Sequence, residues 1–131
     1  MIFLKNERVK GFSPHINLWL DIKADIEIKI ITGEYEPGMR VPSITQLAGL
    51  YNIGSTTAQK VLEALCDEKT IYKRQGVGYF VKPHVRDKLA ATHYTVLINR
   101  LSDVISYGVS LGYDINKLQD VFTMACGSTK K

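Results

Sequence analysis

Two neighbouring stretches of the chain hold the residues best suited to chemistry with a polyanion. The first, "STTAQK", places hydroxyl, amide and ammonium groups together at residues 55–60, and the second, "YKRQGVGYF", covers residues 72–80. Serine, threonine and glutamine can hydrogen-bond to base edges, and lysine and arginine pair with phosphates. These residue types and their closeness in sequence favour contact with a nucleic acid.

The glycine-containing stretch has three possible roles, namely a phosphate-binding loop, a plain β-turn or a basic finger. A phosphate loop needs a glycine-rich turn that opens a helix, but here the strand-like "YFVKP" follows. A plain turn would not require basic residues. From Lys69 to Lys82 there are four basic residues and no acidic one, in a chain whose formal net charge is +4. We therefore expect a basic β-hairpin that approaches a polyanion, with Lys73, Arg74, Gln75 and Gly76 at its tip.

The elements that position these stretches follow from hydrophobic spacing. Apolar residues at helical spacing predict a helix from Ile16 to about Thr32, ended by Gly33. Ser43, followed three residues later by glutamine, predicts a capping box and a short helix that ends near Tyr51. A third helix is expected over residues 55–68, then a hairpin with strands near 71 and over 79–81. This order predicts a mainly α fold with a small β-hairpin, a winged helix-turn-helix.

In this layout the N-terminal residues of the third helix would face the DNA major groove. Residues just before and inside the second helix, Arg40 and Thr45, would lie near phosphates. A polar helix start also serves simply for capping or solvation, so this second interpretation stays open. The expected DNA contacts are Arg40, Ser43, Thr45, Ser55, Thr56, Thr57, Gln59, Lys60, Lys73, Arg74, Gln75 and Gly76.

Beyond Pro83 the apolar residues follow a seven-residue repeat. Such a narrow seam must be buried, either on the protein's own first helix or on a second copy of the chain, and we favour the second copy. Gly112 can end the long helix, and Asp114 can start a final short one. The expected dimer contacts are Ala90, Tyr94, Leu97, Leu101, Val104, Gly108, Leu111, Ile115, Leu118 and Phe122.

These features divide the chain into a lead-in over 1–12, a winged domain over 13–83, a dimerisation tail over 84–126 and a frayed end over 127–131. No apolar run is long enough to span a membrane and no leader is recognisable, so we expect a cytoplasmic protein. No paired carboxylates, activated nucleophile or ligand cluster stands out, and the three histidines are scattered. We therefore expect no enzyme activity, metal site or cofactor.

The stretch from residue 30 to 81 closely resembles the DNA-binding domain of GntR-family transcription regulators. The matching motifs are "GEYEPGMRVPS", the pair Leu47-Ala48, and "RQGVGYFV" at residues 74–81. The short tail resembles that of the YtrA subfamily, in which such helices mediate dimerisation. The resemblance implies a repressor-type regulator that binds an inverted-repeat operator as a homodimer.

The sequence departs from the family pattern at several positions. Arginine is common in the family where this chain has Thr45, Ser55 and Gln59, and threonine where it has Tyr79. These differences imply weaker phosphate anchoring and a different operator. The main alternative is a winged-helix module that binds a protein in place of DNA.

Overall fold

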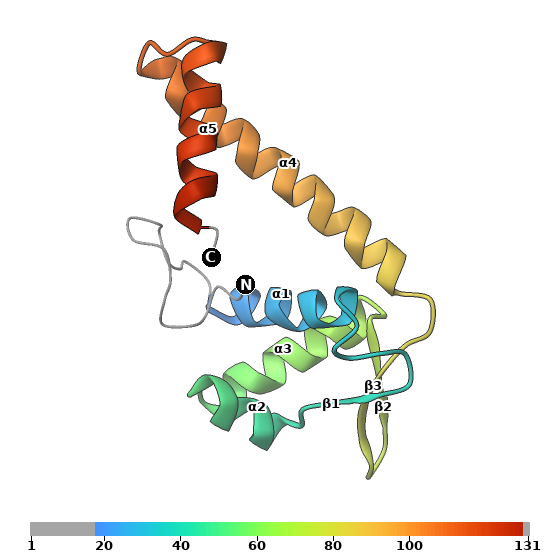
Figure 1. The fold of residues 1–131 in the computed structure, drawn as a ribbon. Coiled ribbons are helices and arrows are strands. Elements are labelled where there is room, and N and C mark those ends of the chain that lie inside the picture. Colours follow the sequence, from blue (N-terminus) through green and yellow to red (C-terminus); the bar gives the residue numbers. More distant parts are fainter. Residues whose placement is uncertain (1–17, 130–131) are drawn as a thin grey trace. The chain divides into compact units, whose positions relative to one another are not determined.

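The computed structural model describes residues 18–129, so the lead-in over 1–12, His15 and the last two residues lie outside it. The contacts between residues divide the chain into one compact unit that ends at Ala90 and a second that begins at Ala91. The elements are α1 (Leu18–Ile31), β1 (Arg40–Val41), α2 (Ile44–Tyr51), α3 (Ser55–Asp67), β2 (Ile71–Arg74), β3 (Gly78–Val81), α4 (Arg86–Ser110) and α5 (Ile115–Thr129) (Figure 1).

The first unit packs α1, α2 and α3 around one hydrophobic core, with a small sheet at its edge (Figure 1). The buried apolar residues lie four apart on α1 and three and four apart on α3, as an amphipathic helix requires. Val85 and Leu89, around the start of α4, also pack into this core, which places the end of the unit beyond Pro83. The fully buried apolar side chains are Ile22, Ile26, Ile30, Val41, Leu47, Ala58, Val61, Leu62, Leu65, Ile71 and Val81. The winged helix-turn-helix predicted from the sequence is confirmed.

The sheet has three antiparallel strands in the order β1-β3-β2. The hairpin pairs Ile71 with Val81 and Arg74 with Gly78. The strand β1 pairs Arg40 with Phe80, and it was not predicted. Two residues are too short to show the alternation by which a strand is recognised in a sequence. We call β2, β3 and the turn between them, residues 71–81, the wing.

The capping box predicted at α2 is present. The Ser43 hydroxyl accepts from the backbone N–H of Gln46 at 3.2 Å, and the Gln46 side-chain oxygen accepts from the Ser43 N–H at 3.0 Å. The helix ends at Asn52, whose φ of 55° is left-handed and turns the chain toward α3. Both ends of α2 are therefore set by nearby residues, the start by the capping box and the end by Asn52.

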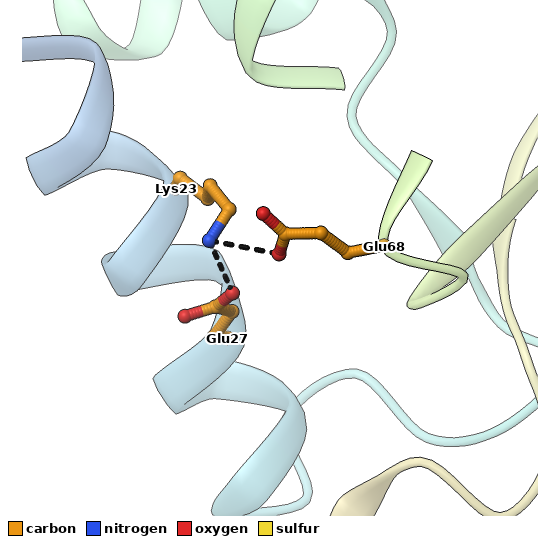
Figure 2. Close-up of polar contacts among 3 residues, drawn as sticks. All are labelled: Lys23, Glu27 and Glu68. Atoms are coloured by element: carbon orange, nitrogen blue, oxygen red, sulfur yellow. Dashed lines mark hydrogen bonds and ion pairs between the residues drawn. The ribbon is translucent and has the colours of Figure 1, made fainter. Parts of the chain in front are cut away.

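Two polar contacts tie α1 to the other helices. Lys23 lies 2.8 Å from Glu27 on α1 and 2.9 Å from Glu68 at the end of α3 (Figure 2). Burial lowers the pKa of Lys23, but the hydrogen bonds and charges of the two glutamates raise it more, so the net shift is upward. Because the ammonium stays charged, it fixes the C-terminal end of α3 against α1.

The second tie joins α1 to α2. The Tyr51 hydroxyl donates a hydrogen bond to Oδ2 of Asp25, a residue that is 2% exposed. The other carboxylate oxygen, Oδ1, is buried without a hydrogen-bond partner among the described residues. A buried carboxylate with one hydrogen bond depends strongly on that bond, because desolvation penalises each unpaired oxygen.

Tyr51→Phe is expected to lower the free energy of unfolding by about 1–3 kcal/mol, because it removes the hydroxyl bound to Asp25. Burial, and then the bond to Asp25, raise the pKa of Tyr51 above its ordinary value. A raised pKa means that the neutral phenol stabilises the fold fully below pH about 10 and less as the pH rises beyond it. Urea unfolding should therefore show a constant difference between the two proteins from pH 6 to 9 that shrinks above pH 10.

Tyr35→Phe provides the matched control. Burial also raises the pKa of Tyr35, but its hydroxyl makes no hydrogen bond to a described residue. Equal losses for Tyr35→Phe and Tyr51→Phe would mean that the bond to Asp25 contributes nothing to stability.

The second unit is a helical hairpin. The end of α4 and the start of α5 are joined through Gly112, which has a φ of 89°, and the Asp114 carboxylate accepts from the N–H of Lys117 at 2.9 Å. Gly108 is buried, and a Cβ there would collide with the Leu118 side chain. The glycine expected in a dimer seam thus serves close packing between α4 and α5 of one chain. The helix α5 continues through Gly127 to Thr129.

Candidate nucleic-acid interface

The start of α3 leaves its polar side chains unused by the helix itself. The N-cap is Gly54, which has extended backbone angles and makes no side-chain capping bond. Ser55 and Thr56 are exposed, Thr57 is half-buried, and none of their hydroxyls hydrogen-bonds to a described residue. The capping interpretation of these residues is therefore not supported, and their hydroxyls remain available to a ligand. We call Ser55, Thr56, Thr57, Gln59 and Lys60 the recognition face.

The two longer side chains of this face are held in defined positions. The Gln59 amide nitrogen donates to the carboxylate of Glu63 at 2.8 Å, one turn further along α3. The Lys60 ammonium lies 4.6 Å from the centre of the Trp19 ring on α1. Gln59 and Lys60 are both exposed, so the N–H groups that these contacts do not use remain available to a ligand. Neither partner was predicted, because single polar pairs carry no periodic signal in a sequence.

The wing presents its cations on aromatic rings. The turn closes with a hydrogen bond of 2.8 Å from the Val77 N–H to the Arg74 carbonyl, and Gly76 supplies the required positive φ of 75°. The Arg74 guanidinium lies 5.3 Å from the centre of the Phe80 ring, and the Lys73 ammonium lies 5.7 Å from that of Tyr79. Rings at these distances attract cations and restrict where they point. Lys73, Arg74, Gln75 and Gly76 are all exposed.

The remaining expected contacts lie on β1 and α2. Thr45 is exposed on the first turn of α2, as a phosphate contact requires. Ser43 uses its hydroxyl for the capping box, so that oxygen already accepts a backbone N–H. The Arg40 side chain reaches the turn of the wing, where it donates to the carbonyl of Val77. Thr45 and Arg40 both line an open hollow of about 560 Å³ beside α2.

The described residues offer little for catalysis, metal binding or membrane insertion. Burial raises the pKa of the Cys66 thiol, the opposite of what activates a cysteine nucleophile. Within residues 18–129, no three histidine, cysteine or acidic side chains gather where they could hold a metal ion. None of the described helices is both long and apolar enough to cross a bilayer.

Comparison with known proteins agrees with the geometry. Residues 18–81 match the model of the bacterial regulatory proteins of the gntR family. A curated relative, the uncharacterized HTH-type transcriptional regulator YurK of Bacillus subtilis, is 31% identical over 77 residues, which are 58% of this chain and 32% of that protein. The chain spans about a third or less of the length of the curated relatives it matches.

Solved structures share the fold. A GntR family transcriptional regulator from Listeria monocytogenes superposes with a TM-score of 0.71 at 23% identity, over 86% of this chain and 98% of that one. YtrA from Sulfolobus acidocaldarius, a GntR-family transcription factor, gives 0.51 at 22% identity, over 95% and 99%. The DNA-binding domain of AraR, solved with its operator ORX1, gives 0.50 at 23% identity, over 56% and 89%. Because the first two matches cover 86% and 95% of this chain, the likeness includes the helices after the wing. The resemblance noted in the sequence is thereby confirmed, and the chain belongs to the GntR family of bacterial regulatory proteins.

Proposed function

We propose that this protein is a cytoplasmic transcription repressor that binds an inverted-repeat DNA operator as a homodimer. The observation that carries the proposal is the recognition face, whose hydroxyls lie at the start of α3 without serving as caps. The acid-free wing follows directly in the chain and adds exposed cations. The AraR domain, which has the same fold, was solved on its operator, and this supports a similar use here.

In this proposal the start of α3 enters the major groove. Gln59 can bind adenine through its amide, and Glu63 limits the directions in which that amide points. Ser55 and Thr56 can reach base edges or phosphates, and the methyl group of threonine suits thymine. The α3 residues would therefore supply most of the sequence preference.

The wing and α2 would supply the contacts that do not depend on sequence. Lys73 and Arg74 pair with phosphates, and Gly76 lets the backbone come close to the DNA. Gln75 at the tip and Thr45 on α2, which are both exposed, would hydrogen-bond phosphate oxygens. Lys60, held over Trp19, adds a cation at the edge of the recognition face.

The homodimer would form through the second unit. Seven of the ten expected contacts are exposed in the single chain: Tyr94, Leu97, Leu101, Val104, Leu111, Ile115 and Phe122. The exposed Ile98 and Ile105 widen the apolar face of α4. Monomeric proteins rarely expose a continuous apolar surface of this kind, so a second copy would cover it. A two-fold dimer would present two recognition faces and thus require an inverted repeat.

Selection of bound sequences from a random DNA pool tests the function. We expect an inverted repeat whose half-sites lie about 10 base pairs apart or a multiple of this. With Lys73 and Arg74 of two subunits each on one phosphate, log Kd should change with log salt at a slope of about 3–4. No enrichment and no affinity even at low salt would contradict the proposal. Salt-insensitive capture of a protein partner would instead favour a protein-interaction module.

A further inference from the structure

The side chain of Arg40 spans from β1 to the turn of the wing. Arg40 pairs with Phe80 in the sheet register, and its guanidinium lies 6.0 Å from the centre of the Phe80 ring. Its Nη2 donates to the carbonyl of Val77, which lies in the turn between β2 and β3. One side chain thus connects the short edge strand, the aromatic ring on β3 and the end of the hairpin.

The second glycine of the wing makes room for this side chain. A Cβ on Gly78 would lie 2.8 Å from Nε and 3.1 Å from Nη2 of Arg40, closer than atoms normally approach. Gly76, two residues earlier, has open space around its position instead. The two glycines therefore have different roles, since Gly76 forms the turn and Gly78 admits the guanidinium.

The contacts of Arg40 reach the residues that carry the proposed phosphate contacts. Arg74 lies on the same Phe80 ring at 5.3 Å, and its carbonyl closes the turn that contains Val77. Fixing Phe80 and Val77 from β1 therefore fixes where the Arg74 guanidinium is presented. A bidentate, planar guanidinium can make the ring and carbonyl contacts together, which a lysine ammonium cannot.

We propose that Arg40 is a positioning residue that holds the wing in its DNA-binding arrangement, with Gly78 as its required partner. This inference rests on the proposed DNA binding for its functional consequence. It revises the expectation that Arg40 itself contacts a phosphate. The arrangement of the wing in the free protein does not depend on DNA, so the two proposals can fail separately.

Arg40→Lys separates positioning from direct contact. A lysine keeps the charge and serves a phosphate well as a point charge, so a direct contact would survive the change with affinity and salt slope unaltered. If Arg40 positions the wing, affinity for the selected operator falls about tenfold, the loss of a hydrogen bond to a charged group. The salt slope also falls, because Lys73 and Arg74 lose their phosphates. Fluorescence anisotropy at several salt concentrations measures both quantities.

Gly78→Ala should reproduce this loss without changing any charge. Gly38→Ala is the matched control, because it also places alanine at a positive φ, in the turn before β1, but meets no neighbouring atom and lies outside the proposed DNA contacts. The control should weaken binding less than Gly78→Ala. Combining Arg40→Lys with Gly78→Ala should cost little more than Gly78→Ala alone, because both changes break one contact.

A measurement without DNA keeps the inference testable if the DNA proposal fails. Backbone heteronuclear NOE values for residues 75–78 report the order of the turn on the fast timescale. Arg40→Lys should lower these values, and Lys73→Met, which leaves the Arg40 contact intact, should not. Unchanged NOE values with parental affinity in Arg40→Lys would overturn the inference. If the unaltered chain binds no DNA, the proposed function fails, and the NOE values alone decide the role of Arg40.

Discussion

Replacing Leu101 with aspartate is expected to convert the dimer into a monomer and to weaken operator binding by about a hundredfold or more. Leu101 is 46% exposed in the single chain and lies among the seam residues of α4. A carboxylate there would be buried without a partner in the dimer, which strongly penalises association. Loss of the second recognition face removes the gain of 10²–10⁴ that linked binding sites provide, by order of magnitude.

Light scattering and operator binding together measure this result. The mass should fall from twice the chain mass of 14.7 kDa to that value, and binding to a single half-site should persist. Asn99→Asp is the matched control, because it adds the same charge two residues away on the far side of the helix. A parent protein that is already monomeric, or a Leu101→Asp variant that stays dimeric, would contradict the seam as the interface.

The first unit was largely predictable because its signals are local. Helical spacing and the Ser43 capping box located α2, and the glycines located the wing. The predicted helix over 55–68 agrees with α3 to within one residue. Such boundaries depend on residues that are close together in the sequence, so the sequence alone is enough to predict them.

The contacts between distant residues could not be predicted. Asp25 reads as a polar position in a helix, yet it is buried against Tyr51. Arg40 reads as a free cation before α2, yet its guanidinium lies against Gly78, far along the chain. In both cases the function of the side chain depends on a partner that only the fold brings close. Gly108 is a third example, because a larger residue there would collide with Leu118 on the next helix.

Replacing both Gln59 and Arg74 with alanine is expected to weaken operator binding strongly, because it removes one contact from the recognition face and one from the wing. Base contacts by glutamine contribute about 1–3 kcal/mol each, and a dimer loses two of them. Each Arg74 adds a phosphate contact, so the affinity should fall on the order of 10²–10³-fold, measured by anisotropy with the selected operator.

The two single variants should weaken binding in different ways, which locates each contact. Arg74→Ala should lower the salt slope and weaken all sequences alike, whereas Gln59→Ala should keep the slope and relax the preference at one position of each half-site. The control removes the same kinds of group from α5, through Lys117→Ala and Gln119→Ala, and should leave affinity unchanged. If the Gln59 and Arg74 double variant bound as well as the parent, α3 and the wing would not be the DNA surface. Binding would then have to come from another part of the chain, because these two elements hold the base-reading amide and the best-placed guanidinium of the proposed site.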